Sequence, residues 1–236
     1  MSGPRGKRNG KHEVDFARSF AEIDAALASG ERAESAWYDQ VRDLIERAYL
    51  ATDDPQTQSG LGGDAAHWAR RRRVLVEAID RDGTILDVGC ANGLLMETLV
   101  AWAGERGYRL EPYGLDISPR LAALARARLP QWAERIFVGN VVDWEPPRRF
   151  DYAFTGLEYV PAARQPDLVA RLRSRIVAPG GRLVFTSYRA RGAAEAAPLA
   201  ERLRSWGVPV TGEAVAFDDA TGVVATRIVW SDTTPR

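Results

Sequence analysis

Apolar positions recur at helical spacing through the first third of the chain. In residues 14–28 and again in 36–50 they return every three or four positions, which places them on one face of a helix. Residues 52–64 are rich in Gly, Asp, Ser and Thr and contain Pro55, so they predict a loop. A third helix is predicted over about 65–79. This part of the chain therefore predicts amphipathic helices, each with one face to bury.

From residue 84 onward, short apolar runs alternate with amphipathic segments. The runs predict strands over 84–88, 112–116, 135–139, 150–155 and 182–187. Helices are predicted between and after them, over 94–103, 119–129, 166–177 and 193–206. Two further apolar runs, 208–217 and 222–230, flank a turn-forming segment and predict a terminal hairpin. Strand–helix alternation of this length predicts an α/β fold, a doubly wound and mostly parallel sheet of seven strands in which the hairpin adds an antiparallel edge.

We expect three parts along the 236 residues: a disordered leader over 1–13, a helical extension or lid over 14–82, and a Rossmann-like core over 83–236. A chain of this length can form one sizeable domain with a short extension. No apolar run reaches the roughly 18 residues that a membrane-spanning helix needs. The leader is polar and basic and lacks the apolar stretch of a secretion signal, so a cytoplasmic location is expected.

Composition and charge exclude several classes of function. Basic and acidic residues number 32 each, so a broad basic surface for nucleic acid is not indicated and no DNA partner is expected. The only lysines are Lys7 and Lys11, which leaves the predicted core without a lysine for a phosphate loop or a Schiff base. With one cysteine and two histidines, no metal site is predicted. Cys90 alone cannot form an intramolecular disulfide, which suits a reducing compartment.

The first predicted strand ends in a loop with two glycines, Asp87-Val88-Gly89-Cys90-Ala91-Asn92-Gly93. Glycines let the backbone turn tightly and approach a ligand, and the helix that follows directs free N–H groups to the same place. The dinucleotide fingerprint is G-x-G-x-x-G, whereas this loop reads G-x-x-x-G. Its only formal charge, Asp87, would repel a pyrophosphate and attract the sulfonium and ammonium of S-adenosylmethionine. Asp87 could also pin the loop by accepting backbone N–H bonds, and an ordinary strand-to-helix turn is the alternative.

The second and third strands are followed by residues suited to an adenosine. Asp116 can accept both hydroxyls of a ribose, and Ile117 would cover the adenine face. NAD enzymes use the same acidic device, so Asp116 indicates a ribose without identifying the cofactor. A helix cap is the alternative for Asp116, although Ser118 has the stronger claim to that role. Asn140 and Asp143 are candidates for hydrogen bonds to the adenine edge, with Asn140 favoured by position, and either could simply close a turn.

In this order and spacing, these motifs resemble the class I S-adenosylmethionine-dependent methyltransferase family over about residues 84–188. Ala91 replaces the frequent middle glycine of the family's loop. The family's ribose acid falls on Asp116, its adenine-edge position falls on Asn140 and Val141, and the turn at 179–181 is a common family feature. The resemblance implies a Rossmann-like fold and S-adenosylmethionine as the cofactor. It implies these cofactor-binding residues: Asp87, Gly89, Cys90, Ala91, Asn92, Gly93, Asp116, Ile117, Asn140, Val141, Asp143 and Thr155.

The segment after the fourth strand bears on the methyl acceptor. Many small-molecule members of the family have Glu-His-Val where this chain has Glu158-Tyr159-Val160. Tyr159 thus replaces a possible histidine base. With an ordinary pKa near 10 a tyrosine is a poor base, but it is a usable hydrogen-bond donor or acceptor. Lining the pocket wall is the alternative for Tyr159. The Asn/Asp-Pro-Pro-Tyr/Phe motif of the family's amine-directed nucleic-acid enzymes is absent, which disfavours adenine N6 methylation.

The glycine-rich segment 58–70 precedes the core and is a candidate lid loop. His67 is the only histidine outside the leader and is a candidate general base, with an exposed position at a helix start as the alternative. Trp68 could stack on adenine or substrate, and core packing is equally compatible with the sequence. The four arginines at 70–73 could offer a guanidinium to the methionine carboxylate or contact a nucleic-acid phosphate. A solvated basic face is their default interpretation.

We therefore predict an enzyme that transfers a methyl group from S-adenosylmethionine to an oxygen or nitrogen of a small molecule. The sulfonium is a strong electrophile and alignment supplies much of the acceleration, so a catalytic triad is not required. An RNA-modifying methyltransferase is the first alternative, motivated by the basic leader and the arginines at 70–73. An NAD-dependent Rossmann oxidoreductase and a cofactor-binding protein without catalysis are the others. No membrane partner is expected, and the sequence does not indicate an oligomeric state.

Overall fold

The computed structural model describes residues 16–188, 198–218 and 221–235. The predicted leader, the first two residues of the first predicted helix and residues 193–197 of the last one lie outside this part of the chain. No helix among the described residues is both long enough and apolar enough to span a membrane.

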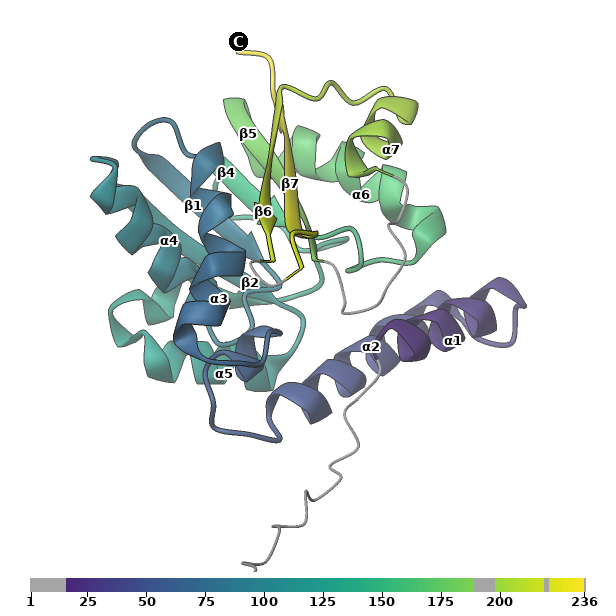
Figure 1. Cartoon of the computed structure of the whole chain (residues 1–236). Coiled ribbons are helices and arrows are strands. Elements are labelled where there is room, and N and C mark those ends of the chain that lie inside the picture. Colours follow the sequence, from purple (N-terminus) through teal and green to yellow (C-terminus); the bar gives the residue numbers. More distant parts are fainter. Residues whose placement is uncertain (1–15, 189–197, 219–220, 236) are drawn as a thin grey trace, which may run out of the picture.

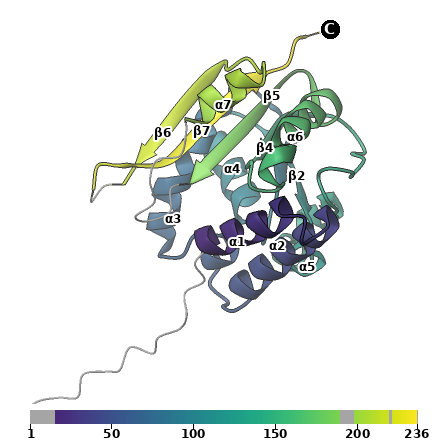
Figure 2. The ribbon, with the colours of Figure 1, turned by 90° about the vertical axis from the view of Figure 1, so that its right-hand side faces the viewer.

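The first helices form a pair beside the main body of the molecule. These are α1 (Phe16–Ala28) and α2 (Glu34–Tyr49), which lie side by side in Figures 1 and 2. The Trp37 indole donates a hydrogen bond to Asp24 Oδ1 at 2.7 Å and so joins the two helices. After a loop that contains the short 3-10 turn η1 (Thr57–Ser59), the third predicted helix follows as α3 (Ala65–Arg72) and the 3-10 segment η2 (Arg73–Ala78). The three predicted helices are thus confirmed, and the second part of the third is a 3-10 helix rather than an α-helix.

Seven strands form one sheet in the order β3-β2-β1-β4-β5-β7-β6. Their bounds are β1 (Gly83–Val88), β2 (Leu110–Asp116), β3 (Ile136–Val138), β4 (Phe150–Thr155), β5 (Val177–Tyr188), β6 (Gly212–Phe217) and β7 (Val224–Asp232). The strands β1 to β5 pair in parallel, and β7 runs antiparallel to both β5 and β6. This confirms the predicted doubly wound, mostly parallel sheet with a hairpin at one edge (Figure 1).

Helices cover both faces of the sheet (Figures 1 and 2). Their bounds are α4 (Leu94–Glu105), α5 (Pro119–Arg128), η3 (Pro130–Arg135), η4 (Ala162–Arg164), α6 (Gln165–Arg171), η5 (Leu172–Ile176) and α7 (Leu199–Ser205). One buried cluster joins the sheet to α6 and α7, and a second joins it to α3, η2 and α4.

Neighbouring strand residues belong to opposite clusters, because successive side chains of a strand point to opposite faces. In β1, Ile85 faces α4 whereas Leu86 faces the α6 side, and in β5 Val184 and Phe185 divide in the same way. Burial of both faces explains why the parallel strands appear in the sequence as continuous apolar runs rather than alternating ones.

Two elements differ from their prediction in detail. The predicted turn at 179–181 lies inside β5, where the pairing shifts from Phe150 opposite Val177 to Tyr152 opposite Arg182. This offset makes a bulge, and Gly180 adopts a φ of +73° within it. The predicted helix at 166–177 is α6 followed by the π-helical turn η5.

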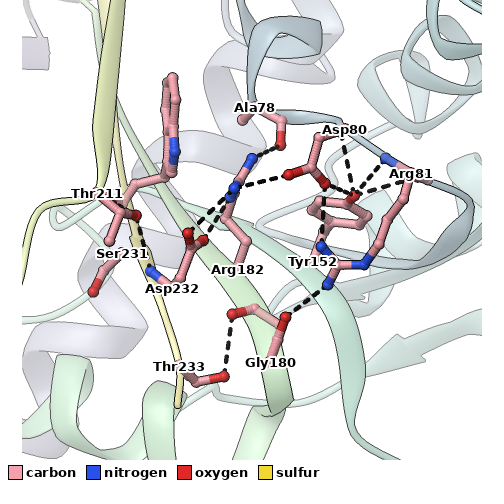
Figure 3. Close-up of polar contacts among 12 residues, drawn as sticks. Ala78, Asp80, Arg81, Tyr152, Gly180, Arg182, Thr211, Ser231, Asp232 and Thr233 are labelled. Carbon is pink, nitrogen blue, oxygen red and sulfur yellow. Dashed lines mark hydrogen bonds and ion pairs between the residues drawn. The ribbon is translucent and has the colours of Figure 1, made fainter. Parts of the chain in front are cut away.

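A polar network ties β5 and β7 to the chain before β1 (Figure 3). It lies at the end of the sheet opposite the carboxyl ends of the parallel strands, because Asp80 closely precedes β1. Arg182 pairs with Asp232 at 2.6 Å and with Asp80 at 2.9 Å. The Tyr152 hydroxyl donates to Asp80 Oδ1 at 2.7 Å. These contacts stabilise the end of the sheet where the parallel strands begin. The end where they finish is left for a ligand, as is usual for parallel α/β sheets.

Candidate functional site

Two adjoining cavities lie at the carboxyl ends of the parallel strands. The first, here called the α2 cavity, lies between α2 and the ends of β1, β2 and β3 and encloses about 690 Å³, part of it open to solvent. The second, here called the β4–β5 cavity, encloses about 450 Å³ between the loop after β1, the ends of β4 and β5, and α3. Four residues line both: Val88, Gly89, Ala91 and Tyr159. The two cavities therefore meet over the loop after β1.

The loop after β1 is held open by left-handed backbone conformations. Gly89 and Gly93 have φ values of +77° and +76°, as suits glycine. Ala91 has a φ of +48° and is the only described residue other than glycine with a positive φ. The family's frequent glycine at this position is thus replaced by an alanine in a conformation that costs about 1 kcal/mol. The Ala91 amide donates to Asp116 Oδ2 at 2.8 Å, which fixes this conformation.

Asp116 joins the loop after β1 to the loop after β2. Its side chain is 6% exposed. Its Oδ1 accepts from the Ser118 amide and its Oδ2 from the Ala91 amide, both at 2.8 Å. Burial raises the pKa of Asp116 to about 6 against the two amides, which lower it, and the charge of Glu46 also raises it. Each oxygen keeps a second lone pair, so the carboxylate can still accept two hydroxyls of a ribose from the α2 cavity that it lines.

The residues after β3 divide between cavity and surface. Asn140 and Val141 line the α2 cavity, as does Ile117 from the end of β2. The Asn140 Oδ1 accepts from the Val142 amide at 3.2 Å, which leaves its side-chain NH₂ group available to a ligand. Asp143 is exposed and lines neither cavity. The position of Asn140 therefore suits an adenine edge and that of Asp143 does not.

Two charged side chains of opposite sign line the β4–β5 cavity. Asp87 is 4% exposed and Arg72 is 5% exposed. Asp87 Oδ2 and Arg72 Nη1 are both buried and have no hydrogen-bond partner among the described residues. Burial, and then the charge of Asp116, raise the pKa of Asp87 to about 7, while Arg72 lowers it. Since buried polar atoms are normally satisfied, the pair fits a ligand that brings both an anionic and a cationic group.

Arg72 is held in place by its surroundings. Its guanidinium carbon lies 3.6 Å from the centre of the Tyr188 ring and 5.7 Å from that of Trp68. Its Nη2 lies 3.4 Å from the Ser59 carbonyl oxygen, to which it donates. A guanidinium stacked on aromatic rings keeps its edge free for a planar carboxylate. Arg72 is thus the one arginine of the run 70–73 that lines either cavity.

Tyr159 lies directly over Gly89, where the two cavities meet. A Cβ atom on Gly89 would come within 2.6 Å of Tyr159 Cζ, so only glycine fits beneath the ring. Burial raises the pKa of Tyr159 well above its ordinary value, and the charges of Glu158 and Asp87 add to this effect. The hydroxyl therefore stays protonated at neutral pH and is suited to hydrogen bonding rather than to proton removal.

Of the remaining candidate site residues, some line a cavity and others do not. Cys90 and Thr155 line the β4–β5 cavity. Gly93 lies outside both cavities, as does Asn92, which is fully buried, donates to the Pro55 carbonyl and accepts from the Leu94 amide. These contacts shape the loop rather than face a ligand. His67 also lines neither cavity, and its ring lies against Gly63.

Trp68 packs in the core. Of the two roles that the sequence allowed, stacking on a ligand and core packing, the structure shows core packing. Its ring is buried against Trp102, with 5.9 Å between the ring centres, and its indole donates to Ser59 Oγ at 2.6 Å. Trp68 and Arg72 are four residues apart on one face of α3. This spacing is the sequence signal that could have singled out Arg72 from its neighbours.

The roof of the α2 cavity was not identified from the sequence. It consists of side chains on one face of α2: Trp37, Tyr38, Val41, Arg42, Ile45 and Tyr49. The amphipathic pattern of α2 predicted a face to bury but did not indicate that this face would cover a cavity. Among the described residues, no group of three or more His, Cys, Asp or Glu side chains is placed to hold a metal ion.

Comparisons with known proteins show the family to which the chain belongs. The family model described as a methyltransferase domain matches residues 63–222, which is more than half of the chain. A search of curated proteins finds no match to the sequence.

Solved structures with the same fold are numerous. The 1,6-didemethyltoxoflavin-N1-methyltransferase of Burkholderia thailandensis, solved with 1,6-didemethyltoxoflavin and S-adenosylhomocysteine, matches with a TM-score of 0.62 at 20% identity, over 86% of this chain and 91% of that chain. The N-methyltransferase NodS of Bradyrhizobium japonicum WM9 matches with a TM-score of 0.54 at 16% identity, over 77% and 98%. The [4+2]-cyclase SpnF matches with a TM-score of 0.58 at 16% identity, over 84% and 96%. At these identities the likeness establishes the fold, while the family model establishes the family. The chain belongs to the methyltransferase domain family and is a class I methyltransferase, an enzyme that uses S-adenosylmethionine as its methyl donor.

Proposed function

We propose that this enzyme binds S-adenosylmethionine across both cavities and methylates a nitrogen or oxygen of a small molecule. The observation that carries the proposal is the pair of unsatisfied buried atoms, Arg72 Nη1 and Asp87 Oδ2, in one cavity. The amino-acid end of the cofactor brings a carboxylate and an ammonium. The pair therefore matches that end in both charges.

The chain's own residues then hold the cofactor at three points. Arg72 binds the carboxylate, and Asp87 accepts a hydrogen bond from the ammonium, each through an atom that is otherwise unpartnered. Asp116 accepts the ribose hydroxyls, and Asn140 donates to the adenine edge in the α2 cavity. When bound, the cofactor supplies a sulfonium whose methyl group is already electrophilic. The protein's part is to align an acceptor with that methyl group and to exclude water.

We propose that α2 acts as the lid within the extension at 14–82. Its apolar side chains Trp37, Val41 and Ile45 face the α2 cavity, and they would cover the adenosine and keep solvent from it. The balanced charge of the chain gives no broad basic surface for a nucleic acid, which favours a small molecule as the acceptor.

We propose that the acceptor side is formed by Tyr159, which follows β4 and lines both cavities where they meet. We propose that the Tyr159 hydroxyl hydrogen-bonds the acceptor. A nitrogen acceptor agrees with the N-methyltransferases among the structural neighbours, the toxoflavin and NodS enzymes. The role of His67 as a general base stays a prediction. Its side chain lines neither cavity. Balanced charge and the single cysteine lead us to propose the cytoplasm as its location.

Isothermal titration tests the proposed function directly. The full chain should bind S-adenosylmethionine and S-adenosylhomocysteine in the micromolar range and should not bind NAD. Transfer of a labelled methyl group to small-molecule fractions of an extract, with none to RNA at low salt, should follow. Binding of NAD in place of the methyl donor, or labelling confined to RNA, would overturn the proposal.

A further inference from the structure

We propose that Glu46 is a positioning residue that couples closure of α2 to the carboxylate of Asp116; this inference rests on the proposed function. Glu46 lies in the last turn of α2, and its side chain is only 12% exposed. Its Oε1 accepts a hydrogen bond from the Ser118 hydroxyl at 2.5 Å, and its Oε2 lies 3.4 Å from Arg120 Nη1. A carboxylate on the lid helix is thus anchored at the first turn of α5, beside the proposed ribose site.

Ser118 carries this contact to Asp116. Its hydroxyl accepts from the Leu121 amide at 3.0 Å as the cap of α5, so its single proton is directed to Glu46. Its backbone amide donates to Asp116 Oδ1 at 2.8 Å. Ser118 is 1% exposed, so when α2 moves away its hydroxyl loses a buried acceptor. The Ala91 and Ser118 amides hold the carboxylate of Asp116, and the hydrogen bond from the Ser118 hydroxyl to Glu46 extends this chain of contacts to α2.

The other end of α2 has a matching anchor without this connection. Glu34, in the first turn, lies 3.3 Å from Arg164 Nε, and both side chains are close to half exposed. Neither residue contacts Asp116 or Ser118 in any described hydrogen bond or ion pair. The two carboxylates thus fasten the same helix, but only Glu46 reaches the residues beneath the ribose. Glu34 is therefore the control for a purely mechanical role of the lid.

The test uses the full chain and S-adenosylhomocysteine as the probe, with affinity measured by isothermal titration. The variant E46A should weaken binding at least tenfold. The variant E46Q, whose amide oxygen can still accept from the Ser118 hydroxyl, should stay within threefold of the natural chain. So should the control E34Q, which removes the charge paired with Arg164 and keeps an acceptor for the Tyr38 hydroxyl. In the double variant E46A/D116N, the affinity should lie within threefold of that of D116N alone, because both changes remove the same function.

The outcomes separate the two proposals. No binding by the natural chain would overturn the proposed function itself. Normal binding, with losses from E46A and D116N that multiply in the double variant, would overturn the positioning role of Glu46, as would an E46A affinity within threefold of normal. If E46A does not fold, E46M removes the carboxylate while it keeps most of the length of the side chain and leaves Ser118 as the cap of α5. A tenfold loss in folded E46M supports the coupling, and unchanged affinity contradicts it.

Discussion

Arg72 and Asp87 bring opposite charges to one cavity without meeting in a hydrogen bond of their own. Each is almost fully buried, and each leaves one polar atom without a partner among the described residues. A buried polar atom of a charged group that lacks a partner costs about 1–3 kcal/mol or more, and two such atoms in one small cavity are a costly arrangement for folding alone. The arrangement is understandable if a zwitterion completes both, and S-adenosylmethionine carries one at its amino-acid end.

The first prediction concerns the carboxylate partner. The change Arg72→Met keeps much of the aliphatic stem and removes the guanidinium that stacks on Tyr188. Affinity for S-adenosylhomocysteine should fall about 10- to 100-fold, because a charge-assisted hydrogen bond contributes about 1.5–3 kcal/mol. Affinity for adenosine, which has no carboxylate, should change by less than about twofold. Titration of both ligands into both proteins measures the difference.

Equal losses for the two ligands would show that Arg72→Met disturbs the whole site. The change Arg70→Met is the matched control, since Arg70 is exposed and lines neither cavity. It should leave both affinities unchanged.

The second prediction concerns pH. Burial and the charge of Asp116 raise the pKa of Asp87 to about 7 in the free enzyme, and a protonated carboxyl group has no charge for an ammonium. Affinity for S-adenosylhomocysteine should therefore fall as the pH is lowered from 7.5 to 5.5, at up to about tenfold per unit. The change Asp87→Asn should weaken binding at pH 7.5 and flatten this dependence above pH 6, below which Asp116 titrates. A pH-independent affinity in the natural chain would contradict the assigned role of Asp87.

The same shift has a consequence for stability. A carboxyl group whose pKa is higher in the folded state than its unfolded value of about 3.9 stabilises the fold below that value. This contribution is lost as the pH rises through about 7, the pKa of folded Asp87. The ligand-free Asp87→Asn variant should consequently unfold at a higher temperature than the natural chain at pH 8, and the gap should shrink at pH 4.

The third prediction concerns the loop after β1. Ala91→Gly should raise the free energy of unfolding by about 1 kcal/mol, because glycine adopts a φ of +48° without the strain that alanine has there. Affinity for S-adenosylhomocysteine should stay within about threefold. Urea unfolding measures the first quantity. A lower stability for Ala91→Gly would mean that the alanine methyl group contributes packing that outweighs its backbone strain.

The fourth prediction separates stability from binding. Arg182 lies between Asp232 and Asp80 (Figure 3). None of the three residues lines either cavity. Arg182→Met leaves two carboxylates without their shared partner and should lower the free energy of unfolding by about 2–3 kcal/mol, since the partners are only partly buried. The folded variant should bind S-adenosylhomocysteine as the natural chain does. A loss of affinity at a temperature where the variant is folded would contradict the prediction that this network affects stability and not ligand binding.

Much of the fold could be predicted because the sheet is buried on both faces. Strands such as β1 and β4 appear in the sequence as continuous apolar runs. The loops that follow the strands contain residues whose chemistry indicates the class of ligand. The roof of the α2 cavity could not be predicted in this way. An amphipathic helix shows which of its faces is buried, but the sequence pattern does not contain the surface against which Trp37 or Ile45 packs.

The candidate site was predictable to the extent that its residues follow strands. Asp87, Asp116 and Asn140 all lie at the predicted edge and line a cavity there. His67 is a candidate as the histidine outside the leader and Asp143 for its place after the third strand, and neither side chain lines a cavity, because these criteria do not fix the direction of a side chain. Arg72 was visible only as one of four arginines, and its burial depends on the packing of α3 against β6 and β7.

A crystal structure of the full chain with S-adenosylhomocysteine tests the central claim most directly. The account predicts the ligand's carboxylate within hydrogen-bond distance of Arg72 Nη1, at roughly 3 Å, its ammonium at Asp87 Oδ2, and its ribose at Asp116. A ligand whose amino-acid end lies outside the β4–β5 cavity, with Arg72 and Asp87 still unpartnered, would contradict it.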